Sequence, residues 1–254
     1  DKNMEHLEGA LGPELVRRPD GWQPEEASAL ASQMALSPAT AGRWGLRTGF
    51  EIDYRGLHSG PLAQMSALLR AFEGSPVHQR LLRMASVSHA VTLHEQGFEG
   101  FPSSTVPGLF RQPIRVFQIP EALPRTFVVS GARIADAYAA LETLVSPEFD
   151  PAREVILPNG LPAPPDVQPP GRSTIRAEKA DRVRLEVDLE RPGYVVLTDG
   201  FDPGWLVTLD GAPVAALRAN LVFRAVAVPA GRHVVEWIYR PWAMQLGLTI
   251  SGAA

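Results

Sequence analysis

Two acidic residues, Asp199 and Asp202, lie in the most polar stretch of the sequence, Asp199-Gly-Phe-Asp-Pro-Gly-Trp205. A pair of carboxyl groups held about 5 to 10 Å apart can serve as the acid and the base of a glycosidase. Sequence spacing does not establish that distance. Aspartates beside glycine and proline also accept hydrogen bonds from backbone amides and so form tight turns. The turn is the simpler interpretation, and no residue of the chain is predicted to be catalytic.

Other side chains near these aspartates are of types that bind sugars. Trp205 is able to stack on a sugar ring, although a tryptophan that begins an alternating strand more often belongs to the core. Arg218 and Asn220 share one strand face at a spacing of two and are able to hydrogen-bond a glycan or simply to face solvent. The predicted glycan-binding set is therefore Asp199, Asp202, Trp205, Arg218, Asn220 and Arg224.

No metal or cofactor site is predicted. The run His94-Glu95-Gln-Gly-Phe98 begins like a zinc-protease helix, but Phe98 stands where the second histidine ligand is required. The chain contains no cysteine, which excludes thiolate metal ligands and a cysteine nucleophile. Phosphate-binding and dinucleotide-binding glycine motifs are missing from the sequence as well.

Composition indicates a folded chain, and its charge gives no electrostatic footprint for binding a polyanion. The 254 residues are 45% hydrophobic, which is enough for a sizeable core in one large domain or two ordinary ones. The formal net charge is −4, and the lysines and arginines are scattered along the chain. Nucleic acid is therefore not expected as a partner.

The first part of the chain predicts a mixed α/β region over residues 1–145. Proline and acidic residues at Pro24-Glu25-Glu26 are typical of a first helical turn, and Ser75 followed by Pro76 is typical of another helix start. Apolar residues at helical or alternating spacing then place the elements. The expected helices start at 24, span 59–72, start at 75 and span 134–144, and the expected strands are 87–93, 114–119 and 125–129.

The second part, residues 146–242, predicts an antiparallel β-sandwich of jelly-roll-like form. A proline-rich stretch at 158–170 resists regular structure, and beyond it the apolar residues alternate with a period of two. Asp210-Gly211 is typical of a hairpin turn. The expected strands are 183–189, 194–197, 205–209, 214–219, 221–228 and 233–239. Together with the first region, this gives an α+β fold.

The last residues of the sequence have two interpretations. An apolar segment from Leu246 to Ala254 follows Tyr239, Arg240 and Trp242, which are residue types that collect at a membrane interface. Residues 243–254 are therefore either the truncated start of a membrane helix or a frayed last strand.

An ordered set of motifs between Leu81 and Ser251 resembles the C-terminal soluble region of the bacterial YfhO-like membrane proteins. The motifs are Ala122-Leu-Pro-Arg-Thr-Phe127, Phe149-Asp-Pro-Ala-Arg-Glu154, Asp199 to Trp205, Asp210-Gly211, Arg218-Ala-Asn220, Phe223-Arg-Ala-Val226, and Pro229-Ala-Gly-Arg-His233 through Tyr239-Arg-Pro241. The order of the whole set carries the resemblance, because each motif alone is common.

The resemblance implies a polytopic membrane protein similar to GT-C-type glycosyltransferases, which modify cell-envelope polymers from lipid-linked sugars. This chain would then be an accessory or glycan-recognition domain on the extracytoplasmic face of the bacterial plasma membrane. Its partners would be the membrane helices of the parent protein and an envelope glycan or lipid-linked sugar. The catalytic residue would lie outside this sequence, and residues 243–254 would begin a membrane helix. The alternative is a free-standing carbohydrate-binding or adhesion module.

Overall fold

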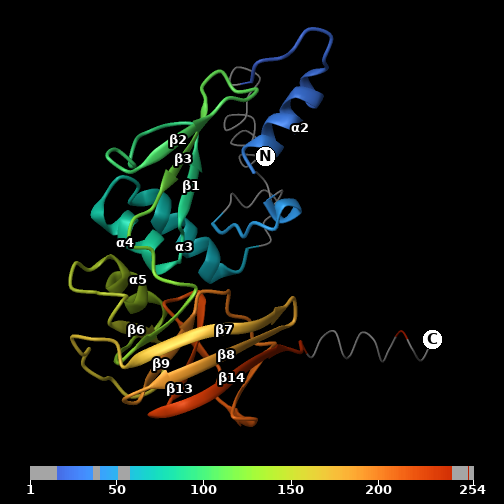
Figure 1. Cartoon of the computed structure of the whole chain (residues 1–254). Helices are drawn as coiled ribbons and strands as arrows, with labels where there is room; N and C mark the ends of the chain where they lie inside the picture. The colour runs from blue at the N-terminus through green and yellow to red at the C-terminus, as the bar shows by residue number, and fades with distance from the viewer. Residues whose placement is uncertain (1–15, 37–40, 51–57, 242–250, 252–254) are drawn as a thin grey trace. The chain divides into compact units, whose positions relative to one another are not determined.

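The computed structural model describes residues 16–36, 41–50, 58–241 and 251. The chain divides into two compact units (Figure 1). The first consists of Asp1–Arg83 and Val87–Ala122, and the second consists of Met84–Ser86 and Leu123–Ala254. Helices and mostly antiparallel sheets make up the described residues, which confirms the α+β class.

The first unit combines helices with a small antiparallel sheet of strand order β1-β3-β2. Its helices are α2 (Pro24–Met34), the short 3-10 helix η1 (Ala41–Trp44), α3 (Gly60–Ala71) and α4 (Pro76–Met84). Its strands are β1 (His89–Thr92), β2 (Ser103–Val106) and β3 (Ile114–Gln118). The expected helices and the strands at 87–93 and 114–119 are thereby confirmed within a few residues.

Local sequence explains how the helices of this unit begin. The Ser75 hydroxyl accepts a hydrogen bond from the His78 amide at 3.3 Å, and Pro76 occupies the first helical position of α4. Strand β2 was not expected from the sequence. Its residues Ser-Ser-Thr-Val are all exposed, so they lack the alternation that reveals a half-buried strand.

The second unit contains two antiparallel sheets. The five-stranded sheet has the order β11-β10-β14-β8-β7, and the four-stranded sheet has the order β12-β13-β9-β4. The strands are β4 (Thr126–Val129), β7 (Gly171–Lys179), β8 (Arg182–Leu189), β9 (Gly193–Leu197), β10 (Trp205–Leu209), β11 (Ala212–Val214), β12 (Leu217–Ala219), β13 (Phe223–Val228) and β14 (Gly231–Tyr239). Strand β4 pairs with β9, so residues 126–129 belong to this unit.

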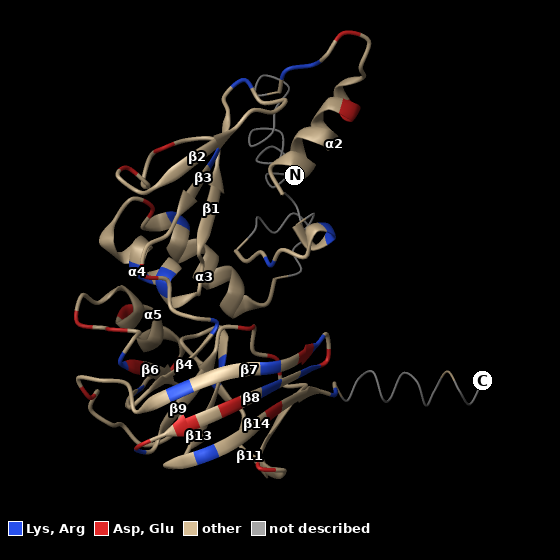
Figure 2. Cartoon of the chain, in the orientation of Figure 1, with Lys and Arg blue, Asp and Glu red and all other residues tan. Residues whose placement is uncertain are grey.

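One hydrophobic cluster contains residues from both sheets. The alternating residues of β8 are buried as the period of two predicts, and they meet apolar residues of β9 and β13. The cluster members with the least exposure include Leu185, Leu197, Val226, Val235 and Trp237. The other face of β7 and β8 carries charges of both signs (Figure 2), among them the ion pair of Arg176 and Glu186 at 2.7 Å.

The helix expected at 134–144 begins later than the sequence suggested. Ile134 is the last residue of strand β5 (Gly131–Ile134), which pairs in parallel with β6 (Glu154–Leu157). Helix α5 (Ala137–Val145) starts after Asp136, whose side chain accepts the amides of Tyr138 and Ala139. The prediction was wrong by three residues because an apolar strand residue precedes the cap at helical spacing.

The strand expected at 214–219 is two short strands in different sheets. Strand β11 ends at Val214, and β12 begins at Leu217. Strand β7 was not predicted, because its sequence is polar and a bulge between Ile175 and Ala177 interrupts the alternation.

The expected membrane helix at 243–254 lies outside the described residues except for Ser251. Among the helices that the structure describes, none has the length and apolar character needed to cross a membrane. The interpretation of residues 243–254 therefore stays a prediction.

Candidate functional site

Asp199 lies at the centre of an ion-pair network at one end of the second unit. Its two oxygens accept hydrogen bonds from Nε and Nη2 of Arg125 at 2.7 and 2.6 Å. Nη2 of Arg224 donates to the same carboxylate at 2.7 Å. Nη1 of Arg125 also donates to Glu178 on β7 at 2.6 Å. Guanidinium groups therefore engage both oxygens of Asp199.

Arg224 is a buried charge that the pattern of β13 places on the core face. Arg224 lies on the same face of the strand as Val226 and Val228, which are two members of the hydrophobic cluster. Its side chain is only 2% exposed. Its guanidinium carbon lies 3.8 Å from the centre of the Trp205 ring and 5.4 Å from that of Trp237. The aromatic faces and Asp199 thus compensate for the loss of water around this charge.

Burial and two neighbouring charges change the pKa of Arg224. Burial lowers this pKa to about 10, Asp199 opposes the shift, and the neighbouring charge of Arg125 adds to it. The guanidinium still carries its charge at neutral pH. Nε and Nη1 of Arg224 and Nε1 of Trp237 have no hydrogen-bond partner among the described residues.

Asn220 has a structural role at the turn between β12 and β13. It is fully buried and adopts the left-handed region with φ 48°, which asparagine tolerates better than most residues. Its side-chain oxygen accepts a hydrogen bond from the Ile156 backbone amide at 2.9 Å, and its backbone amide donates to the Ile156 carbonyl at 2.9 Å. Asn220 therefore joins this turn to β6.

Asp202 forms the turn that its glycine and proline neighbours suggested. Its Oδ1 accepts the amide of Gly204 at 2.7 Å, as in an Asx turn. A Cβ atom at Gly204 would lie 2.8 Å from the Tyr239 ring and 2.9 Å from Oδ1 of Asp202. Position 204 therefore requires glycine, because the side chains of Asp202 and Tyr239 both pack closely against it. Asp202 and Tyr239 consequently lie next to each other.

Two aromatic contacts involve exposed and half-exposed side chains of this turn and of the strands β10, β12 and β14. The rings of Trp205 and Tyr239 are a cross-strand pair of β10 and β14, with centres 5.0 Å apart and planes at 44°. The guanidinium of Arg218 lies 4.7 Å from the centre of the Phe201 ring. Burial raises the pKa of Tyr239, and the charge and hydrogen bond of Asp202 add to this. We call Phe201, Asp202, Trp205, Arg218 and Tyr239 the aromatic rim.

The structure separates the six predicted residues into distinct roles. Asp199, Trp205 and Arg224 come together in the ion-pair and ring cluster, and Asp202 and Arg218 lie in the aromatic rim next to it. Asn220 and Arg224 are buried, so neither offers surface to a glycan in this structure. The role of the others in glycan binding stays a prediction.

Sequence reasoning did not find Arg125, Glu178, Phe201 and Tyr239 as members of this region. Arg125 lies 74 residues before its partner Asp199, and no local spacing reveals such a contact. A signal for Arg125 existed, since it lies in the first motif of the ordered set.

Comparison with known proteins finds no matching family model, no matching curated protein and no matching solved structure. Within the described ranges, no three His, Asp or Glu side chains gather closely enough to hold a metal ion.

Proposed function

We propose that this chain is an extracytoplasmic domain of a polytopic membrane protein similar to the YfhO-like family. In that setting it recognises a cell-envelope glycan for a lipid-linked-sugar-dependent glycosyltransferase and has no catalytic residue of its own. We also propose that its second unit is a β-sandwich of jelly-roll-like form. The common hydrophobic cluster of the two sheets supports the sandwich.

One observation carries this proposal: three motifs of the ordered set meet at a single carboxylate. Arg125 comes from the first motif, Asp199 from the third and Arg224 from the sixth, and all three are joined by contacts of 2.6 to 2.7 Å. Residues far apart in the sequence that build one network act as a unit in defining a fold. This supports reading the ordered motifs as the mark of a common fold.

The aromatic rim supports recognition as the role of that fold. Ligand sites combine aromatic surface with a few polar groups that fix orientation, and the rim offers rings from Phe201, Trp205 and Tyr239 beside Asp202 and Arg218. Hydrolysis needs carboxyl groups free to donate and accept protons. Asp199 is engaged by two arginines and Asp202 by the Gly204 amide, which favours binding over hydrolysis.

Turnover assays test the absence of catalysis. We expect the chain to bind envelope polysaccharide without cleaving glycosides or sugar phosphates. Clear hydrolysis that is lost in D199N and D202N variants of unchanged stability would contradict the proposal.

Reporter fusions to the full-length gene product test the location. Alkaline phosphatase folds to its active form outside the cytoplasm, whereas β-galactosidase is active inside. We expect phosphatase activity from fusions within residues 123–241 and no β-galactosidase activity. The reverse pattern would contradict the location. If the full-length gene encoded no membrane helix, the free-standing carbohydrate-binding module would replace this proposal.

A further inference from the structure

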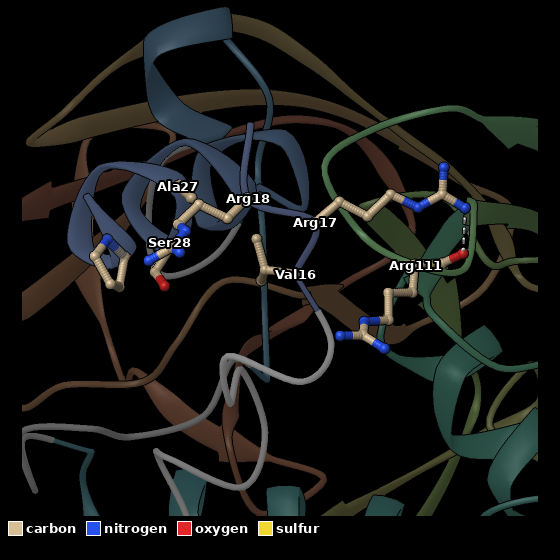
Figure 3. Close-up of a pocket in the computed structure, with 7 residues that line it drawn as sticks. Val16, Arg17, Arg18, Ala27, Ser28 and Arg111 are labelled. Atoms are coloured by element: carbon tan, nitrogen blue, oxygen red, sulfur yellow. Dashed lines mark hydrogen bonds between the residues drawn. The ribbon is translucent and has the colours of Figure 1, made fainter. Parts of the chain in front are cut away.

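A pocket of about 680 Å³ lies in the first unit, and none of its lining residues belongs to the ion-pair network or to the aromatic rim. Figure 3 shows the side chains that surround it. Its lining residues are Val16, Arg17, Arg18, Pro24, Ala27, Ser28 and Arg111. Three of these seven described residues are arginines, and none of the seven is acidic.

The arginines of the pocket lie on two segments, residues 16–18 and residues 109–111, and backbone contacts hold these segments together. Val16 forms an isolated antiparallel bridge with Phe110, and the Arg17 amide donates to the Leu109 carbonyl. Nη2 of Arg17 donates to the Arg111 carbonyl at 3.3 Å. The pocket walls are therefore fixed by contacts between chain segments about 90 residues apart in sequence.

Two of the lining residues, Val16 and Ala27, belong to a small hydrophobic cluster. Val16, Ala27, Ala31, Phe110 and Ile114 are buried together, so residues of both arginine-bearing segments and of helix α2 share one core. The pocket lining consequently combines the buried apolar residues Val16 and Ala27 with exposed arginines.

The arginines of the pocket form no ion pair with an acidic side chain in the described part of the chain. Neither Arg18 nor Arg111 forms an ion pair with a described acidic side chain, and Arg17 contacts only a backbone carbonyl. On α2, Glu26 accepts a hydrogen bond from the Gln23 amide at 3.0 Å in the capping box of the helix. Because this box uses the Gln23 amide for a contact within the helix, the arginines are the groups of the pocket lining that attract an anion.

We propose that this pocket binds a phosphate-bearing ligand through Arg18 and Arg111. Guanidinium groups bind phosphate oxygens with two parallel hydrogen bonds, and arginine is the residue that proteins favour for phosphate recognition. Arg18 extends toward Ser28 on α2, whereas Arg111 lies on the far side of Val16 (Figure 3). This separation favours a ligand with more than one phosphate group, or a surface of phosphate headgroups, over a single phosphate ion.

Binding measurements on the whole chain test this proposal with two probes. Inorganic pyrophosphate, titrated by calorimetry at fixed ionic strength, represents a soluble ligand, and vesicles of phosphatidylglycerol, compared with phosphatidylcholine in a flotation assay, represent a lipid surface. We expect saturable binding of at least one probe. Binding of pyrophosphate alone assigns the site to a soluble ligand, and binding of the anionic vesicles alone assigns it to headgroups.

Variants that remove the same number of charges distinguish binding at this pocket from non-specific attraction to the net charge of the protein. We expect R18A/R111A to weaken binding about tenfold or more, and R18K/R111K to restore part of it, because lysine keeps the charge but not the paired geometry. The control R172A/R232A removes two charges from side chains that are 81% and 88% exposed in the second unit, and it should bind as the wild type does. Absence of binding to both probes, or equal loss in the control, would overturn the proposal.

Discussion

The guanidinium carbon of Arg224 lies 3.8 Å from the centre of the Trp205 ring. Trp205 belongs to β10 of the five-stranded sheet, and Arg224 belongs to β13 of the four-stranded sheet. This contact and the bond from Arg125 to Glu178 on β7 therefore join the two sheets at the end where Asp199 lies. A charge on the core face of a strand thus acts as a link between sheets.

Removal of the Arg224 charge should destabilise the second unit. We expect R224A to lower the free energy of unfolding by about 3 kcal/mol, because it removes a buried partner of Asp199 and the packing on Trp205. R224M should cost less, since methionine fills the space without a charge to desolvate. Urea denaturation followed by tryptophan fluorescence measures both. The exposed control R232A should change little, and a loss in R232A equal to that in R224A would contradict the link.

Two substitutions of Asn220 should separate the stability cost of its left-handed backbone from that of its side-chain hydrogen bond. N220A removes the acceptor for the buried Ile156 amide and places alanine at φ 48°, so we expect a loss of about 2 to 4 kcal/mol. N220G relieves the backbone strain and leaves only the lost hydrogen bond, so it should lose less. Equal stability losses in the two variants, measured by thermal unfolding, would show that strain at this turn is negligible.

The pair of His233 and Asp210 should make stability depend on pH. Nδ1 of His233 lies 2.7 Å from Oδ2 of Asp210. This hydrogen bond is the main cause that raises the pKa of His233 above 6.5 and lowers the pKa of Asp210 below 3.8, with the Val234 amide also lowering the latter. The raised pKa of His233 stabilises the fold at low pH, whereas the lowered pKa of Asp210 stabilises it at higher pH.

The histidine contributes fully below pH 6.5, and its contribution is lost as the pH rises through its raised pKa. The aspartate contributes above pH 3.8, and its contribution is lost as the pH falls through its lowered pKa. We therefore expect H233A to lose more stability at pH 5 than at pH 9, by thermal unfolding. H89A is the control, because the His89 ring forms a hydrogen bond with the Ser88 hydroxyl and, among the described residues, no ion pair with a carboxylate. An H233A effect that is independent of pH would contradict the pairing.

Much of the fold could be predicted because burial leaves a period in the sequence. The four alternating apolar residues from Val183 to Leu189 predicted β8, and Ser75-Pro76 predicted the start of α4. Strands β2 and β7 escaped prediction because polar residues on exposed or edge strands leave no such period. Ile134 was assigned to a helix because its parallel partner strand is distant in sequence.

The candidate site was less predictable than the fold. Sequence identified Asp199 and Arg224 as chemically interesting, but spacing could not show that they bind each other and Arg125. Asn220 was expected on a strand face because its neighbour Arg218 is two residues away. The left-handed turn at Asn220 instead directs it into the interior, where it bonds to Ile156.

Titration of purified bacterial envelope polysaccharide into the chain tests the central proposal, glycan recognition by the aromatic rim, most directly. R218A removes a half-buried cation of the rim, and D202N removes a charge while it keeps the oxygen that accepts the Gly204 amide. We predict saturable binding by the wild type and by the R232A control, with affinity at least about tenfold weaker in R218A/D202N. Undiminished binding by R218A/D202N, or no binding by the wild type to any envelope polysaccharide, would contradict the account.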